Sequence, residues 1–165
     1  MARIVQKFGG TSVADVARIK HAALRVKREV DAGHEVAVVV SAMAGVTNRM
    51  VELTSQISSM FDAREYDAVV ATGEQANAGL MALALQDLGI QSRSWLGWQI
   101  PIRTDGAHGK ARIQGFETDE LSRRMAAGEV PVVAGFQGLG PDNRITTIGR
   151  GGSDTSAVAL AGALK

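Results

Sequence analysis

The chain contains no cysteine among its 165 residues. This absence excludes disulfide bonds, thiolate nucleophiles and zinc sites with cysteine ligands, and it is typical of a protein from the reducing cytoplasm. Histidine is scarce as well. His21, His34 and His108 are scattered, without the spacing of a helical zinc site, so we expect no catalytic zinc and expect these side chains at the surface.

Long apolar runs and an excess of one charge are absent too. No segment approaches the length of a membrane span, and the N-terminus lacks the apolar stretch of a signal peptide. The 18 Lys and Arg residues nearly balance the 17 Asp and Glu residues, whereas nonspecific nucleic-acid binding needs many cations that face phosphates. We therefore expect a cytoplasmic protein that binds neither membranes nor nucleic acids.

Strand-like and helix-like segments alternate along the chain. Val36–Val40 is a continuous apolar run, which is typical of a parallel strand covered on both faces. Such alternation predicts an α/β fold, a three-layer αβα sandwich with a mainly parallel sheet. The strands are expected at 4–8, 36–40, within 91–103, at 111–116 and at 130–135, with helices between them and after residue 152.

Helical spacing of apolar residues predicts which helix faces are buried. Ser12 and Asp15 resemble a capping box ahead of the first helix. Core-facing stripes are expected in the second and third helices, and they consist of Met50, Leu53, Ile57 and Met60 in the second and of Ala76, Leu80, Leu83 and Leu88 in the third.

Two glycine-rich turns indicate the chemistry. Residues 7–13 read KFGGTSV and residues 146–156 read TTIGRGGSDTS, each expected between a strand and a helix. Backbone N–H groups at such turns bind phosphate or carboxylate, and glycine lets the backbone approach the anion. With Lys7 in one turn and Arg150 and Asp154 in the other, the pair indicates an enzyme that holds two anionic reactants together. The chain has no G-x-G-x-x-G and no Walker A motif, which argues against a dinucleotide-binding oxidoreductase.

Several of the candidate residues also have a purely structural interpretation. Glu74 opens a helix, where the helix dipole favours a carboxylate whatever its function. Thr47 could cap the second helix, and either Ser153 or Asp154 could cap the last one.

The series of motifs resembles that of the aspartate kinases, in the same order. The matching stretches are KFGGTSV (7–13), SAMAGVTN (41–48), TGE (72–74), VAGFQG (133–138) and TTIGRGGSDTSA (146–157). Aspartate kinases belong to the amino-acid kinase superfamily. The resemblance implies ATP-dependent phosphorylation of the β-carboxylate of L-aspartate, with Mg²⁺ as the partner of ATP, by a homo-oligomeric enzyme. It also implies the first step of lysine, threonine and methionine biosynthesis.

The resemblance implies roles for individual residues. Lys7 and Asp154 would form the catalytic pair, with the carboxylate orienting the ammonium group. Glu74 would bind the ammonium group of aspartate, and Arg150 one of its carboxylates, because a guanidinium matches a carboxylate bidentately. No general base is needed, since a β-carboxylate with a pKa of ~4 is already ionised. The further predicted contacts are Lys7, Phe8, Gly9, Gly10 and Ser41 for ATP, and Ser41, Thr47, Gly151, Gly152 and Ser153 for aspartate.

In the family, a nucleotide-binding half and regulatory ACT domains follow the matching segment. We therefore expect residues 1–165 to form the N-terminal, amino-acid-binding part of a kinase domain, without an ACT domain and incomplete for catalysis by itself. Two alternatives stay open, a related kinase acting on another small acid and a non-catalytic fragment that binds an amino acid. ADP formation from aspartate and ATP distinguishes them.

Overall fold

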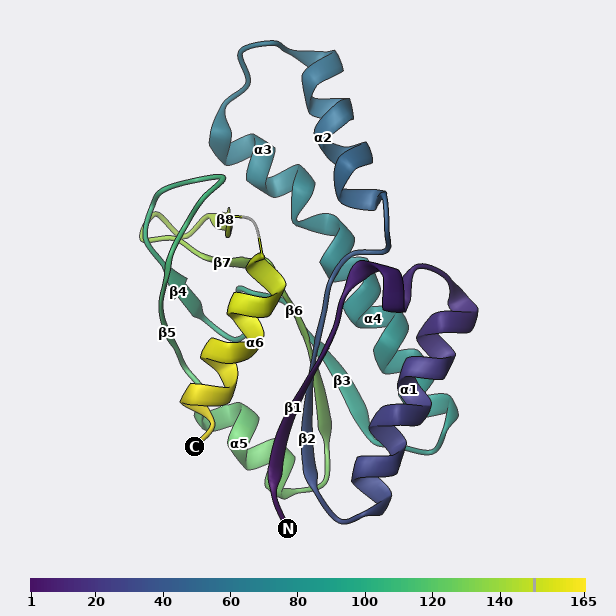
Figure 1. Cartoon of the computed structure of the whole chain (residues 1–165). Coiled ribbons are helices and arrows are strands. Elements are labelled where there is room, and N and C mark those ends of the chain that lie inside the picture. The colour runs from purple at the N-terminus through teal and green to yellow at the C-terminus, as the bar shows by residue number, and fades with distance from the viewer. Residues whose placement is uncertain (150) are drawn as a thin grey trace.

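A computed structural model describes residues 1–149 and 151–165 of the chain. Its first sheet has four parallel strands in the order β1-β2-β6-β3. These strands are β1 (Arg3–Phe8), β2 (Glu35–Val40), β6 (Val130–Ala134) and β3 (Ser92–Trp95). Helices cover both faces, α1 (Val16–Asp31) and α4 (Thr72–Asp87) on one side and α5 (Asp119–Ala126) and α6 (Gly152–Ala163) on the other (Figure 1).

The central strand β2 faces both layers of helices. Its side chains alternate, so Val36 and Val38 join the core beneath α1 and α4, while Ala37 and Val39 join the core beneath α5 and α6. All four side chains are at most 2% exposed. A continuous apolar run is what two covered faces require, and the prediction of a three-layer αβα sandwich is confirmed.

A second, smaller sheet lies beside α6. Its strand order is β5-β4-β7-β8, formed by β5 (Ile113–Phe116), β4 (Ile102–Thr104), β7 (Gln137–Leu139) and β8 (Ile145–Thr147). The β7–β8 hairpin turns at Asn143, whose φ of 61° suits asparagine. The hairpin means that β8 leads directly into the second glycine-rich turn.

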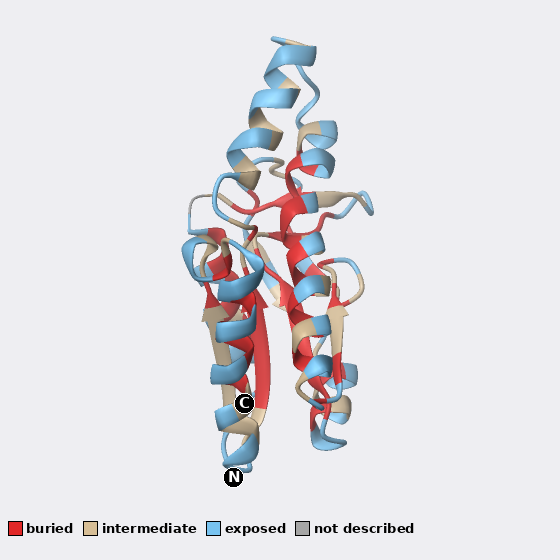
Figure 2. Cartoon of the chain, turned by 90° about the vertical axis from the view of Figure 1, so that its right-hand side faces the viewer, coloured by how far each residue is buried: buried red, intermediate tan, exposed pale blue. Residues whose placement is uncertain are grey.

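The helices α2 (Val46–Ile57) and α3 (Ala63–Val70) form a pair that stands above the first sheet (Figure 1). α2 contains no buried residue, and Ile57 and Met60 are 89% and 93% exposed. The predicted core stripe of this helix is therefore wrong, as the exposed upper helices in Figure 2 illustrate. Helical spacing shows only that an apolar stripe exists, because the layer that would cover it lies elsewhere in the chain.

The buried face of α4 also differs from the prediction. Leu80 and Leu83 are 38% and 61% exposed, and the core face consists of Ala78, Met81 and Leu85. α4 is rich in alanine and leucine on every side, so periodicity alone could not select the buried face.

The helix starts differ from the predicted caps. Asp15, and not Ser12, is the N-cap of α1, where its Oδ1 accepts the backbone N–H of Arg18 at 2.8 Å. Ser12 lies in a short 3₁₀ helix, η1 (Gly10–Val13). In the two other helices for which a cap was predicted, α2 and α6, the N-cap is a glycine. It is Gly45 before α2, with a φ of 84°, and Gly151 before α6, with a φ of 74°. Thr47, Ser153 and Asp154 therefore do not act as N-caps.

Candidate active site

The register of the first sheet gathers the ends of three strands. Phe8 pairs with Val40, and Val40 pairs with Ala134, so β1, β2 and β6 end side by side. Ligands of parallel α/β sheets bind beyond these carboxyl ends. A cavity of about 300 Å³ opens there, and we call it the strand-end cleft. Nine of the predicted site residues line it, namely Lys7, Gly10, Ser41, Thr47, Glu74, Gly151, Gly152, Ser153 and Asp154.

Two larger hollows lie elsewhere on the molecule. One of about 470 Å³ lies beside α1, and one of about 550 Å³ lies beside the start of α5. Neither brings together the residues of the two glycine-rich turns. The residues that line the strand-end cleft therefore make it a better candidate for the active site than the two larger cavities.

Lys7 and Asp154 meet in the strand-end cleft although they are far apart in the chain. The lysine Nζ lies 2.8 Å from Asp154 Oδ1, which confirms the predicted pairing. Lys7 leaves the sheet at the end of β1, and Asp154 lies in the first turn of α6. The carboxylate side chain is 70% exposed, so solvent screens the pair and it contributes little to folding stability.

Glu74 supplies a buried carboxylate from the first turn of α4. The residue is 3% exposed, and its Oε1 accepts the backbone N–H of Ala42 at 3.2 Å. Its Oε2 is buried without a hydrogen-bond partner among the described residues. Burial raises the pKa of Glu74 to about 7, against the opposing effect of backbone hydrogen bonds to the carboxylate. A cationic group entering the cleft would satisfy the free oxygen and restore the charged form.

The second glycine-rich turn packs closely against the strand-end cleft. A Cβ on Gly152 would lie 2.7 Å from Phe136 Cδ2, and a Cβ on Gly135 would lie 2.8 Å from Ser153 Oγ. Only glycine fits at these two positions, which lets the start of α6 approach the end of β6. Arg150, the predicted carboxylate ligand, lies outside the described residues.

Ser41 and Thr47 flank the other wall of the cleft. The backbone N–H of Ser41 donates to the carbonyl of Phe8 at 3.1 Å, and its carbonyl accepts Asn77 Nδ2 at 2.7 Å. These bonds hold the exit of β2 while the Ser41 side chain stays in the cleft lining.

Two predicted ATP contacts do not line the strand-end cleft. The Phe8 side chain is 8% exposed and belongs to the core beneath α1, because alternation along β1 turns it away from Lys7. Gly9 lies under the lysine, and a Cβ there would come within 3.1 Å of Lys7 Nζ. Gly9 thus makes room for the ammonium group.

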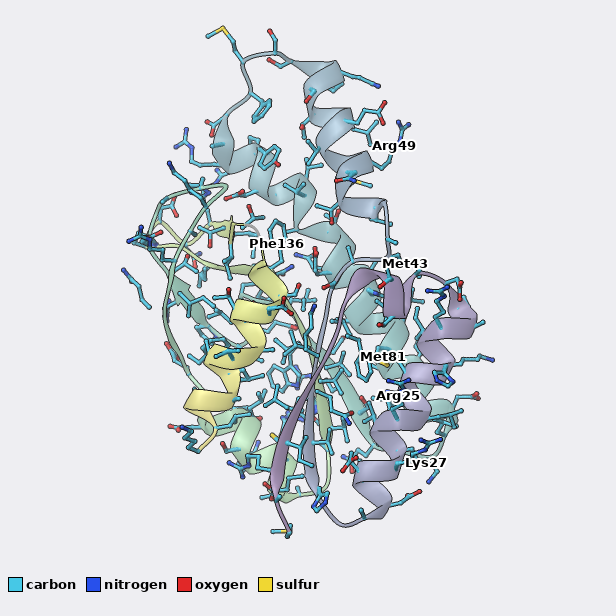
Figure 3. The ribbon with its side chains drawn as sticks, in the orientation of Figure 1. Arg25, Lys27, Met43, Arg49, Met81 and Phe136 are labelled. Atoms are coloured by element: carbon cyan, nitrogen blue, oxygen red, sulfur yellow. The ribbon has the colours of Figure 1, made fainter. Side chains whose placement is uncertain are left out.

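Phe136 is a residue of the cleft that sequence reasoning did not single out. It lines the cleft together with Met43, and both side chains are labelled in Figure 3. Its φ of 69° is rare for a bulky residue. Such backbone strain is common at functional sites. Phe136 lies within the matching stretch VAGFQG (133–138), but that pattern does not predict its backbone conformation, which depends on hydrogen bonds with Ile148 and Ser156 far along the chain.

His108 contradicts the expectation that the histidines are surface groups. Its side chain is 9% exposed, and Nδ1 lies 2.7 Å from the buried Asp67 Oδ2. Both residues lie outside the cleft lining.

Among residues 1–149 and 151–165, no cluster of three acidic or histidine side chains could hold a metal ion, and no helix is long and apolar enough to cross a membrane.

Comparison with known proteins identifies the class. The family model described as the amino acid kinase family matches residues 2–165, and the chain belongs to this family.

Within this family, the similar proteins are aspartate kinases. Aspartate kinase Ask_LysC of Stutzerimonas stutzeri is 53% identical over the whole chain, which spans 40% of that protein. The crystal structure of aspartate kinase from Synechocystis is 46% identical, with a TM-score of 0.82 over 97% of this chain and 26% of that one. E. coli aspartokinase III in complex with lysine and aspartate is 25% identical, with a TM-score of 0.78 over 97% of this chain and 46% of that one. The chain thus spans about 40% of the length of the curated relatives it matches.

Proposed function

We propose that the chain is the amino-acid-binding part of an aspartate kinase, which converts L-aspartate and ATP into 4-phospho-L-aspartate and ADP. The observation that carries this proposal is the buried Oε2 of Glu74, which has no hydrogen-bond partner among the described residues and lies in the same cleft as the Lys7–Asp154 pair. The aspartate bound in E. coli aspartokinase III and the names of the relatives support it. Under this proposal, residues 1–165 contribute no ACT domain.

Glu74 would recognise the ammonium group of aspartate. A bound ammonium next to Oε2 stabilises the carboxylate form, so binding below pH 7 releases a proton from Glu74. Arg150 would take a carboxylate of the same molecule. Together, two opposite charges select a substrate that carries both, which disfavours carbamate and nucleotides.

Lys7 would stabilise the transferred phosphoryl group. The reaction forms a bond between a β-carboxylate oxygen and the γ-phosphorus while the bond to the ADP oxygen breaks. Both reactants are anions, so the main task is to align them and to offset the charge on the phosphoryl oxygens. The ammonium, held 2.8 Å from Asp154, and the N–H groups at Gly10 and Gly152 are suited to this task.

The acidic side chains present fit Mg²⁺ only as a partner of ATP. Asp154 is a solvent-exposed carboxylate of the cleft, whereas Glu74 is buried and has a raised pKa. Mg²⁺ usually takes one or two carboxylates together with phosphate oxygens and water. We infer that Asp154 is the one carboxylate available to it among the cleft residues described, and that the phosphates supply the other ligands. The ion would supply positive charge at the phosphoryl oxygens.

The test measures aspartate-dependent ADP formation by the full-length gene product that contains this chain. We expect activity with aspartate and much less with succinate, which lacks the ammonium group. Glu74→Ala should lower the ratio of activity with aspartate to activity with succinate. Arg150→Ala should lower kcat/KM for aspartate by a factor that corresponds to ~2–4 kcal/mol, as expected when a charge loses its partner. Aspartate binding without ADP formation would instead indicate the non-catalytic alternative. An unchanged aspartate-to-succinate ratio in both variants would contradict the assignment.

We further propose that the enzyme is cytoplasmic and self-associates. The lack of cysteine supports the first point. Exposed apolar side chains support the second, because such surfaces favour association; they include Val16, Ile57, Met60, Leu83 and Val158. Sedimentation over a range of protein concentrations tests self-association, and a monomer at all concentrations would contradict it.

A further inference from the structure

Asp67 lies at a buried joint between three segments of the chain. It is 0% exposed on α3, and its carboxylate accepts Thr147 Oγ1–H at 2.5 Å and the backbone N–H of Gly109 at 3.0 Å. His108 Nδ1 is the third partner at 2.7 Å. One carboxylate therefore ties α3 to β8 and to the loop over residues 105–110.

Both sides of this joint lead into the strand-end cleft. On one side, Thr147 lies two positions before Gly149, which lines the cleft. On the other side, α3 runs into α4, whose first turn carries Glu74. Asp67 is thus connected to the residue proposed to bind the ammonium group and to the turn proposed to bind the carboxylate.

A second buried bond reinforces the same connection. Gln137 on β7 is 0% exposed and donates from Nε2 to the carbonyl of Ala71, at 2.9 Å. Ala71 is the residue at which α3 passes into α4. The α3–α4 junction ahead of Glu74 is therefore bonded to the second sheet through Asp67 and through Gln137.

Folding stability does not by itself explain a carboxylate at this joint. A buried carboxylate is costly to desolvate, and apolar residues of similar volume often serve stability as well or better. What the carboxylate adds is directional bonding, since one group on α3 bonds to β8 and to the loop at 105–110 at the same time.

We propose that Asp67 is a positioning residue that sets the separation between Glu74 and the glycine-rich turn at 149–152, and thereby favours aspartate over the longer glutamate. The inference rests on the proposed function. A loosened joint lets the two walls of the cleft adjust, so a substrate longer by one methylene is rejected less strongly.

The experiment measures kcat and KM for aspartate and for glutamate with the full-length gene product. Asp67→Asn should lower the aspartate-to-glutamate ratio of kcat/KM by about 10-fold, mainly through KM, because a methylene in a shaped site is discriminated about 10- to 200-fold. Thr147→Val should act in the same direction, since it removes the hydroxyl donor, whereas Thr147→Ser keeps the donor and should retain the ratio. Glu65→Gln is the matched control, because Glu65 lies on the same helix and pairs with Arg144 at the surface.

The outcomes separate the inference from the proposed function. If the parent enzyme shows no preference for aspartate over glutamate, both the inference and the proposed function are contradicted. If the parent discriminates and Asp67→Asn loses kcat or thermal stability with an unchanged ratio, the residue is only structural and the inference is overturned. Should Asp67→Asn fail to fold, the comparison of Thr147→Val with Thr147→Ser decides, and equal ratios in these two variants overturn the inference.

Discussion

Glu74 places a titratable group where water cannot easily reach it. Its pKa of about 7, raised by burial from 4.5, means that the folded chain holds a proton that the unfolded chain has already lost between those pH values. Folding stability therefore falls as the pH rises from 4.5 to 7, and this loss is complete above pH 7. The rise of the Glu74 pKa from 4.5 to about 7 corresponds to about 3 kcal/mol of folding stability.

Glu74→Gln removes this titration. We expect the variant to gain about 3 kcal/mol over the parent at pH 8 and little at pH 4.5. Urea unfolding of the chain at both pH values measures the difference. Glu65→Gln, which alters a carboxylate that is 67% exposed, is the control. A parent stability that is flat over this pH range would mean that the buried carboxylate does not titrate there.

Lys7 is expected to act mainly in the transition state. Lys7→Met should lower kcat of the full-length gene product by at least ~100-fold and leave KM for aspartate within about 3-fold, because charge on the phosphoryl group grows during transfer. Lys27→Met is a matched control, since Lys27 forms a lysine–aspartate pair of the same 2.8 Å length on the surface of α1. Steady-state kinetics decide the question, and a kcat close to the parent value in Lys7→Met would remove this role.

At the scale of elements, the start of α4 depends on a close approach to neighbouring chain. A Cβ on Gly73 would lie 2.7 Å from Ala42 Cβ and 3.0 Å from Val46 Cγ1, whereas a Cβ on Gly79 in the same helix meets nothing within 4 Å. Only the first glycine is required by packing. The second merely loosens the helix.

The two glycines should respond in opposite ways to alanine. Gly73→Ala should destabilise the chain by about 1–3 kcal/mol through overpacking. Gly79→Ala should stabilise it by about 0.5–1 kcal/mol through helix propensity. Chemical denaturation of both variants measures the contrast. Equal effects of the two substitutions would show that α4 can shift away from Ala42, and that Glu74 is held less tightly than the contacts indicate.

At the scale of the whole molecule, aspartate binding should be visible as stabilisation. A ligand that binds only the folded state at 100 times its Kd adds about 2.7 kcal/mol. If Glu74 binds the ammonium group as proposed, binding requires its ionised form, and its pKa is about 7. The apparent affinity of the full-length gene product should therefore be about 10-fold higher at pH 8 than at pH 6.

Thermal melts with and without aspartate at the two pH values test this linkage. The rise in Tm should be larger at pH 8, and Glu74→Gln should abolish the pH dependence. Succinate provides the control ligand, since it lacks the ammonium group that Glu74 would bind. A rise in Tm that is equal for aspartate and succinate would contradict ammonium recognition by Glu74.

The sequence by itself determined the layers and the motifs. Apolar runs such as Val36–Val40 predict buried parallel strands from local composition alone. The glycine-rich turns predict anion sites, because few other residues let the backbone adopt the turn and approach an anion closely. The pairing of Lys7 with Asp154 could also be predicted, because the two glycine-rich turns were expected at the same edge of the sheet and a cation near phosphate needs an orienting acid. These features depend on neighbours in sequence or on fold-level rules.

Only the tertiary structure decided the rest. The buried face of α4, the exposure of α2 and the burial of His108 against Asp67 depend on which distant element covers each side chain. The same is true of Phe136, whose strained backbone is held by Ile148 and Ser156. The helical spacing of apolar residues indicates only which residues can be buried. Burial itself, and with it the raised pKa of Glu74, is set by contacts between segments that the local pattern does not encode.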